Sequence, residues 1–444
     1  MMNHEELVDL VVEEAIRNGA EDVAALGSLQ KTRMVRFYNN KISVIKAWRN
    51  SGISIMIGLK ERKFVSSFNE ISPEKLIGSV KELIKLGEKS KPNYDYVPLP
   101  KGPFNYIERD HKEDLAYLSG KDLVEYAEIA IERALKEGAK RVAGTLICNS
   151  EDIALKTSAN VFVKDNTSSL ETFVRAFVEK ESSGQGISCS TTLKNFKPEI
   201  AGLEAAKIAK MTKNPKTFQS GRYNVIFGPC IFANLMNNVM EAASAFNVDA
   251  GLSFLNNEIG SNIASPNFTI VDDGTAKDGL NSRIFDDEGT PTKRTIVIGH
   301  GKLKNLLHNT STAKKFKTYS TGNAGWISPS AWNIIIENGA YEENELFKEL
   351  KNGLYITNNW YTRFQDYRNG DFSTVCRDGI FEIKNGEIIT SVKNIRISDN
   401  FPRILKSIGA ISNNRYWIRW WEVATPTLTP YALVKDIGIT KSVF

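Results

Sequence analysis

The pattern of apolar residues changes near residue 221, and this change constrains the fold more than any other feature of the chain. Before it, segments with helical spacing of apolar residues are followed by segments in which apolar and polar residues alternate. After it, short runs rich in β-branched and aromatic residues are separated by turn signals such as Asp-Gly and Asn-Gly. A chain of 444 residues is long enough for two hydrophobic cores. We therefore predict an α+β protein, with an N-terminal mixed α/β domain over residues 1–220 and a mainly antiparallel β domain, barrel- or sandwich-like, over residues 221–444.

Two segments of the predicted N-terminal domain resemble each other. Ala15–Ala20 and Ala134–Ala139 both close a helical pattern with a glycine, which suits the left-handed residue after a helix. A strand-like segment follows each one, at Asp22–Leu26 and at Arg141–Ile147. The sequence therefore predicts two related helix-then-strand units, joined by a loop over about residues 89–106 that is rich in Pro, Lys, Asn and Tyr.

The second half contains one clear hairpin. Gly379–Ile383 and Ile388–Val392 flank Asn385-Gly386, the pair of residues that favours a two-residue turn matching the twist of strands. Only Ile231–Ala245 and Glu343–Leu350 have helical spacing in this half. We therefore expect a β domain with one important inserted helix at residues 231–245.

Composition excludes several classes of function. A net charge of +5 from 57 basic and 52 acidic residues is mild, so we expect no nucleic-acid partner. The basic and aromatic stretch Arg415–Trp421 is typical of a strand packed in a core or an interface, although such residues also stack on single-stranded bases. No apolar stretch reaches the roughly 20 residues of a membrane span. The N-terminus lacks the features of a secretion signal, and the four cysteines include no Cys-x-x-Cys pair, so we expect a cytoplasmic protein with reduced cysteines.

Common catalytic motifs are missing from the sequence. The four histidines, His4, His111, His300 and His308, form no His-Glu-x-x-His motif, and we expect each on the surface or in a turn. There is no Gly-x-Ser-x-Gly and no phosphate-binding loop. Cys376 precedes an arginine that would favour a reactive thiolate, but its strand-like surroundings favour a buried structural cysteine.

Two acidic segments, Asp272–Thr275 and Asp286–Thr290, combine carboxylates with turn residues. Hard cations such as calcium bind carboxylate oxygens. Neither segment has the alternating ligands of a known calcium loop, and Asp and Gly in tandem are also what turns require. The turn interpretation is favoured.

A series of motifs extends over almost the whole chain. In the second half they are Phe285–Thr295, Gly301–Leu303, Ser320–Asn323, Gly370–Ser373, Ile383–Ile388 and Ala424–Leu428, and in the first half Arg36–Asn40, Gly52–Ser54 and Ser66–Asn69. In this order they closely resemble the TldD/PmbA family, whose members have been called modulators of DNA gyrase.

In the catalytic TldD branch, the resemblance implies a zinc peptidase with His-Glu-x-x-x-His on a helix after a Gly-Pro turn, and a cysteine ligand near the C-terminus. Here the turn is Gly228-Pro229, and the motif falls on Asn237–Ala242, where both histidines and the glutamate are replaced. No cysteine follows Cys376. Zinc peptidases need three protein ligands and a carboxylate base, so we expect no metal-binding and no catalytic residues in this chain.

These losses match the PmbA/TldE branch, whose members resemble the catalytic subunit but lack its ligands and pair with it around a cavity. The resemblance therefore implies a TldD-like zinc peptidase as heterodimer partner, with zinc on that partner only, no cofactor here, and unfolded peptides as substrates. An extended peptide would add to strand edges of the β domain, which gives binding with low sequence preference.

Six polar residues within the matched motifs are the candidates for the peptide groove, and the alternative is that structural turns account for half of them: Asn237, Asn238, Glu241, Arg294, Asn323 and Ser373. Glu241 is the one acidic residue left in the motif helix, and we expect it to line the cavity or face solvent rather than act as a base.

Two other functions stay open. One is an active homodimeric metallopeptidase with unorthodox ligands, such as Glu241 with His300 or an acidic turn. The other is a peptide-binding module that acts without a partner. Metal analysis separates the first from a metal-less subunit, and peptide binding by the isolated chain supports the second.

Overall fold

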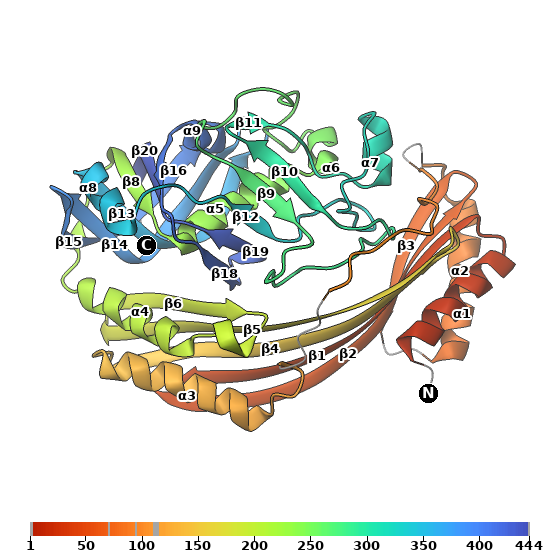
Figure 1. The fold of residues 1–444 in the computed structure, drawn as a ribbon, viewed down its shortest axis with the longest axis horizontal. Coiled ribbons are helices and arrows are strands. Elements are labelled where there is room, and N and C mark those ends of the chain that lie inside the picture. Colours follow the sequence, from red (N-terminus) through yellow and green to blue (C-terminus); the bar gives the residue numbers. More distant parts are fainter. Residues whose placement is uncertain (1–2, 70–71, 94–95, 110–114, 443–444) are drawn as a thin grey trace.

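The computed structural model shows a long curved sheet with paired helices on one face and a second, β-rich half on the other (Figure 1). The structure describes residues 3–69, 72–93, 96–109 and 115–442. His111, which we expect on the surface or in a turn, lies outside the described residues. An α+β protein with extensive antiparallel sheets confirms the predicted fold class.

The first half repeats one unit of structure. Its elements are α1 (His4–Arg17), β1 (Asp22–Tyr38), β2 (Lys41–Leu59), β3 (Arg62–Asn69), α2 (Pro73–Lys89), α3 (Gly120–Lys136), β4 (Arg141–Thr157), β5 (Val161–Glu179), β6 (Ser182–Ser190), the short 3-10 helix η2 (Leu193–Asn195) and α4 (Pro198–Met211). The six strands form one antiparallel sheet in the order β3-β2-β1-β4-β5-β6. β1 and β4 each have 17 residues, β2 and β5 each have 19, and β1 pairs with β4 at the centre. Two copies of a helix, three strands and a helix therefore extend the two helix-then-strand units predicted from the sequence.

The glycines identified in the sequence end the first helix of each unit. α1 is followed by Gly19 at φ 93° and α3 by Gly138 at φ 110°, a backbone conformation that glycine adopts without strain. Ser119 begins α3 with a capping box in which its side chain accepts from the Asp122 N–H.

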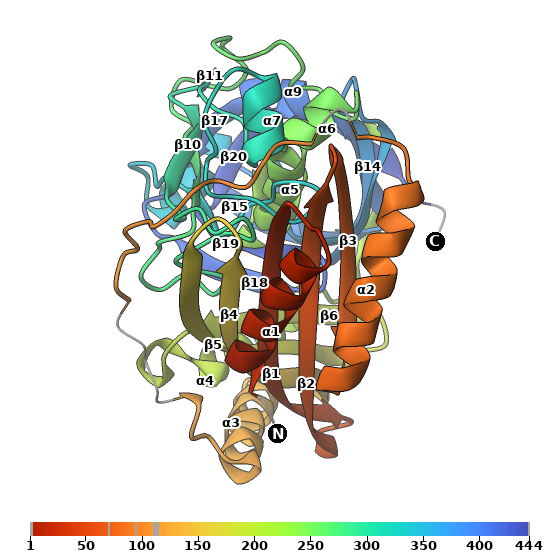
Figure 2. The same cartoon turned by 90° about the vertical axis from the view of Figure 1, so that its right-hand side faces the viewer.

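The two faces of the long sheet pack against different parts of the chain. Val23 and Ala25 of β1 contact α1 and α2, and Val35 and Phe37 of the same strand contact α3, so both helix pairs lie on one face (Figure 2). Ala24 lies on the opposite face, in a core shared with the second half of the chain. Because successive side chains of a strand point to opposite faces, β1 packs against the helices with one face and against the β domain with the other.

The second half contains two sheets. Its elements are β7 (Lys216–Thr217), β8 (Gly221–Phe227), α5 (Pro229–Ala242), α6 (Ala245–Asp249), β9 (Ile270–Asp273), β10 (Arg294–Gly299), β11 (Lys302–Leu303), α7 (Thr310–Lys315), β12 (Ile334–Ile336), α8 (Glu343–Leu350), β13 (Gly353–Asp366), β14 (Asp371–Lys384), β15 (Glu387–Lys393), β16 (Ile395–Asn400), α9 (Phe401–Lys406), β17 (Ile408–Ile411), β18 (Tyr416–Trp420), β19 (Val423–Thr429) and β20 (Ala432–Lys441). One sheet has the order β11-β10-β9-β12-β19-β18. The other runs β13-β8-β20-β16-β14-β15-β7, and an added pairing of β13 with β14 closes five of its strands into a barrel-like circuit.

Several local predictions are confirmed and others need correction. The hairpin between β14 and β15 turns at Asn385-Gly386, both with positive φ, and α8 has the predicted bounds. The inserted helix predicted at residues 231–245 begins at Pro229 and ends at Ala242, because the chain turns at Ser244, which bridges to Leu307. The short helices α6, α7 and α9 are additional to the two predicted, since five or six residues are too few to show helical spacing.

Trp420 of β18 is buried and stacks on Phe173 of β5, with ring centroids 5.7 Å apart. The packing interpretation of the aromatic stretch Arg415–Trp421 is confirmed at this residue. No helix among the described residues is both long enough and apolar enough to cross a membrane.

His308 is buried, which corrects its predicted place on the surface or in a turn. Its ring packs on Phe316, and its Nδ1 lies 3.3 Å from the Thr312 Oγ1. Burial lowers the pKa of His308 to about 4, because the charged ring would lose its hydration.

Stability should therefore fall in mild acid. The unfolded chain keeps a histidine pKa of about 6.5, so between about pH 6.5 and 4 it binds the proton that the folded chain excludes. The free-energy advantage of the wild type over His308→Gln should be largest above pH 6.5 and should shrink by about 3 kcal/mol as the pH falls to 4. Urea unfolding of both proteins across this range measures it, and a constant difference would contradict the buried neutral histidine.

Candidate functional site

Helix α5 crosses the core of the β-rich half between its two sheets. Gly228 precedes the helix and Pro229 opens it, the position where a missing backbone N–H costs least. Most of its apolar residues are buried, and Phe232, Leu235 and Val239 are completely so. Its polar residues Asn234, Asn237, Asn238 and Glu241 follow the spacing i, i+3, i+4, i+7, which places them on a common side of the helix.

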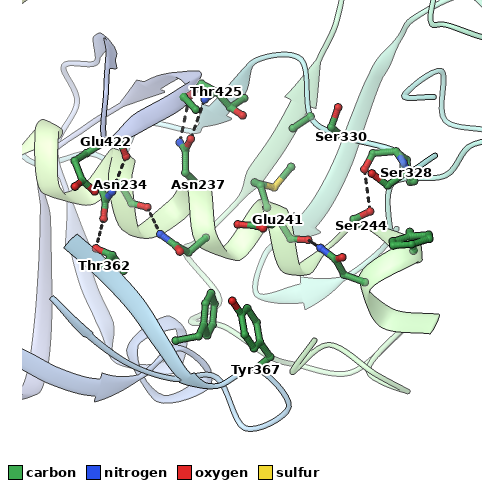
Figure 3. A pocket seen from close by; sticks show the side chains of 18 of the residues that line it. Asn234, Asn237, Glu241, Ser244, Ser328, Ser330, Thr362, Tyr367, Glu422 and Thr425 are labelled. Carbon is green, nitrogen blue, oxygen red and sulfur yellow. Dashed lines mark hydrogen bonds between the residues drawn. The ribbon is translucent and has the colours of Figure 1, made fainter. Parts of the chain in front are cut away.

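This polar side faces a cavity of about 590 Å³ (Figure 3). α5 forms one wall, β13 and the residues after it a second, and β19 with residues 328–331 the others. The lining residues are Asn234, Asn237, Asn238, Met240, Glu241, Ser244, Phe246, Asn247, Ser328, Pro329, Ser330, Ala331, Thr362, Arg363, Phe364, Tyr367, Trp421, Glu422, Ala424 and Thr425. Carboxamide and hydroxyl groups predominate among its polar groups.

Asn237 joins α5 to β19. Its Nδ2 donates to the Thr425 carbonyl (3.2 Å) and to the Thr427 Oγ1 (2.8 Å), and also to the Ala233 carbonyl (3.0 Å). Its Oδ1 accepts from the Thr425 N–H (3.0 Å). The carboxamide thus occupies both backbone hydrogen-bonding groups of Thr425, as a neighbouring strand would.

Asn234 belongs to a buried network at the other end of the cavity. Its Oδ1 accepts from the Asn359 Nδ2 (2.7 Å) and from the Thr362 hydroxyl (2.6 Å), and its Nδ2 donates to the Glu422 carbonyl (2.6 Å). Asn359 also donates to the Thr374 hydroxyl (2.9 Å). This network fixes α5 relative to β13 and β14 and leaves the side chains nearer the middle of the cavity accessible.

Charge in the cavity is sparse. Its lining contains two carboxylates, Glu241 and Glu422, and one guanidinium, Arg363. Glu241 is exposed and lies in the open middle of the cavity (Figure 3). Burial raises the pKa of Glu422. The Tyr361 N–H, which donates to its carboxylate, lowers the pKa in part. Opposite α5, the rings of Phe364 and Tyr367 stack with centroids 4.6 Å apart and provide an aromatic wall.

The residues around the cavity do not fit zinc. The position of the first motif histidine is Asn237, whose Oδ1 and Nδ2 are committed to β19. The position of the second is Ala242, which is buried and absent from the lining. Cys376 is buried in the core, where desolvation raises the pKa of its thiol to about 12. The cavity lining contains no histidine and no cysteine, the donors that zinc prefers.

The structure brings three of the six predicted groove residues to the cavity, namely Asn237, Asn238 and Glu241. Arg294 lies on β10, where it forms an exposed ion pair with Glu337 (2.6 Å). Ser373 is buried in β14 and accepts from the Arg396 guanidinium (3.0 Å).

Asn323, the remaining predicted groove residue, is buried beside the cavity rather than in it. Its Nδ2 donates to the Asp272 carboxylate (2.6 Å) and to the carbonyl of Ser330 (2.9 Å), a residue that does line the cavity. Asn323 therefore supports one wall of the cavity.

Both acidic segments form turns. The Asp273 carboxylate accepts from the Thr275 N–H, and the Asp286 carboxylate accepts from the N–H groups of Glu288 and Thr290. Burial raises the pKa of Asp272 to about 7, although Asn323 and two backbone N–H groups stabilise its charged form. Among the residues that the structure describes, no group of three or more His, Cys, Asp or Glu side chains is placed to hold a metal ion.

Sequence reasoning missed most of the other lining residues. Thr425 lies in the motif Ala424–Leu428, and Asn234 is one helical turn before Asn237. Their positions in the sequence could therefore have identified both as lining residues. Thr362 and Tyr367 come from β13 and the turn after it, which carried no motif.

The chain is similar to proteins of one family. A family model described as the PmbA/TldA metallopeptidase C-terminal domain matches residues 220–441. The chain belongs to the PmbA/TldD metallopeptidase family. This confirms the resemblance seen in the sequence motifs.

Individual relatives agree with this assignment. A metalloprotease PmbA homolog of Buchnera aphidicola subsp. Acyrthosiphon pisum is 31% identical over 220 residues, which are 49% of this chain and 48% of that protein. The chain thus spans about half the length of the curated relatives that it matches.

Solved structures match over nearly the whole chain. A proposed modulator of a DNA gyrase from Thermotoga maritima superposes with a TM-score of 0.87 at 26% identity, over 99% of this chain and 100% of that one. TldE from Thermococcus kodakarensis superposes with a TM-score of 0.89 at 20% identity, over 98% of this chain and 100% of that one. The two chains therefore share the fold.

Removing the Asn237 carboxamide should destabilise the protein more than removing that of its neighbour. Asn237→Ala leaves the Thr425 N–H without its partner and removes one of the two donors to the Thr425 carbonyl, at a cost of about 2 kcal/mol in the free energy of unfolding. Asn238→Ala removes a single bond to the Asn234 carbonyl and should cost about 0.5 kcal/mol. Denaturant unfolding compares the two variants. Equal losses would contradict the bridging role of Asn237.

Proposed function

We propose that this chain is the non-catalytic subunit of a TldD/TldE-type peptidase complex, in which it holds unfolded peptides while a TldD-like partner provides zinc and cleaves them. The observation that carries the proposal is the cavity over α5. It keeps the position of the family's metal helix but presents carboxamides, hydroxyls and aromatic rings in place of zinc ligands.

The cavity lining suits the backbone of an extended peptide. Carboxamides and hydroxyls both donate and accept hydrogen bonds, so they match peptide N–H and C=O groups whatever the side chains are. Asn238, Ser330 and Thr362 line the cavity from three different walls. The stacked rings of Phe364 and Tyr367 offer apolar area to peptide side chains. Low sequence preference follows, as a complex that degrades or trims unfolded peptides requires.

The predicted addition of a peptide to a strand edge needs refinement at β19. Asn237 already occupies the N–H and the C=O of Thr425, so a peptide does not pair there. In our proposal the peptide instead lies along the polar side of α5.

The partner and the compartment complete the proposal. A chain without zinc ligands at its motif helix needs a second subunit for metal-assisted hydrolysis, and a TldD-like subunit would supply it. The four cysteines are all free, as is usual in the reducing cytoplasm, where we place the complex.

Zinc content and peptide hydrolysis test the proposal together. The isolated chain should hold far less than one zinc per molecule and should not cleave an unfolded peptide, whereas adding the TldD-like subunit of the same organism should produce cleavage. Asn238→Trp should fill the cavity and raise the KM of the pair about tenfold with little change in kcat, because it blocks binding and not chemistry.

Lys348→Ala, an exposed change on α8, is the matched control and should leave KM unchanged. Stoichiometric zinc in the isolated chain, with hydrolysis abolished by Glu241→Gln, would instead establish the homodimeric metallopeptidase. Tight peptide binding without any effect of a TldD-like subunit would establish a module that acts alone.

A further inference from the structure

The first unit of the long sheet carries an unusual concentration of positive charge. The 38 residues from Val23 to Lys60 contain seven basic residues and no acidic one. The other 406 residues carry 50 basic and 52 acidic residues and are nearly neutral. The excess charge of the protein is therefore concentrated on β1, β2 and the turns at their ends.

One half of β2 has an unpaired edge. β3 pairs with β2 only from Gly52 to Leu59, and no described strand pairs with the outer side of Lys41–Ser51. This part of β2 is 11 residues long, more than the usual length of a strand. A long free edge presents backbone N–H and C=O groups to any extended chain that approaches it. We call Lys41–Ser51, with Gln30–Arg36 of the paired strand β1, the basic edge.

Cations lie on both faces of the basic edge. Alternation along the strands places Lys31, Arg33 and Arg49 on the face that carries the helices, and Arg36 and Lys46 on the other face. None of these five side chains forms an ion pair with a residue that the structure describes. Arg33 donates to the Ala116 carbonyl, and Lys46 lies over the Trp48 ring. A strand added to this edge would place its own side chains on both faces, within reach of these cations.

The second unit of the sheet shows what covers the same position. β6 pairs with β5 only from Leu170 onward, so Val161–Ser169 of β5 lacks a partner strand just as Lys41–Ser51 does. The segment before α3 lies across it. The Gly102 N–H donates to the Ala159 carbonyl, and Arg109 pairs with Asp165 (3.2 Å).

Exposure separates the two positions on one face of the sheet. On the face that carries the β domain, Val161 and Val163 of the covered edge are 3% and 7% exposed, whereas Val44 of the basic edge is 43% exposed. On the other face both edges expose an apolar side chain, Phe162 (46%) and Ile45 (61%). Apolar side chains on an unpaired strand are a marker of an interaction surface. The basic edge therefore lacks, among the described residues, the cover that its counterpart has.

We propose that the basic edge docks an extended acidic segment of the partner subunit, which adds to β2 as a strand. This inference rests on the proposed function for the existence of that subunit and names the surface that binds it. Backbone pairing along Lys41–Ser51 supplies the register, and carboxylates of the segment pair with the cations on both faces. A second copy of this chain fits poorly, because two basic edges would repel each other. The exposed valine and isoleucine and the open strand edge favour a protein strand over a nucleic acid.

Charge reversal at the edge tests the proposal. Lys46 and Arg49 lie on opposite faces of β2, and the double variant Lys46→Glu/Arg49→Glu reverses one cation on each. Its dissociation constant for the TldD-like subunit should rise at least about tenfold at low salt, with a smaller effect at high salt. Lys302→Glu/Lys304→Glu, on exposed residues around β11, is the matched control with the same change of charge and should bind as the wild type does.

Hydrogen exchange distinguishes strand addition from charge attraction alone. Amides of Lys41–Ser51 should exchange more slowly in the complex than in the isolated chain. If the wild type forms the complex and the double variant binds equally well, without new protection in this segment, the docking surface is refuted while the proposed function stands. If the wild type binds no TldD-like subunit, both fail. Loss of nucleic-acid binding by the double variant, with subunit binding intact, would also overturn the inference.

Discussion

The site depends on the two hydrogen bonds between the Asn237 carboxamide and the backbone of Thr425. They join a helix buried between two sheets to the strand that forms one wall of the cavity. The resemblance to the catalytic branch implies a zinc ligand at this position of the helix, whereas here the side chain forms a structural cross-link. The carboxamide thereby fixes the shape of the cavity. The side chains that stay accessible, Asn238 and Glu241, are those that the cross-link leaves unused.

The long sheet shows how two copies of one unit acquire different roles. Both copies leave half of their second strand unpaired, which follows from a third strand that is much shorter than the second. In the second copy the chain itself covers this position, and the covered surface joins the two halves of the protein. In the first copy the same position is open and basic. Duplication therefore gives one internal contact and one surface suited to another chain.

Much of the fold could be predicted from the sequence, because its signals are local. Glycines after α1 and α3, the capping box of Ser119 and the Asn385-Gly386 turn each determine the backbone through the residue itself. What failed depends on tertiary contacts. The residues around His308 are typical of a turn, but contacts with Phe316 and Thr312 bury its ring. The bridge between Ser244 and Leu307 sets the end of α5. The site was predicted where one helix carries it, at Asn237, Asn238 and Glu241. Thr362 and Tyr367 come from one sheet or the turn beside it and Glu422 from beside a strand of the other sheet, and only the packing of the two sheets around α5 brings them together.

The central claim is that the cavity over α5 binds peptide where relatives with the intact motif are expected to bind zinc. A crystal structure of the chain supplied with both zinc and an extended peptide tests it most directly. Our account predicts continuous peptide density along the polar side of α5, with main-chain contacts to residues such as Asn238, and no anomalous zinc signal in the cavity. A zinc ion bound by Glu241, with the Asn237–Thr425 bonds broken to admit it, would contradict the account.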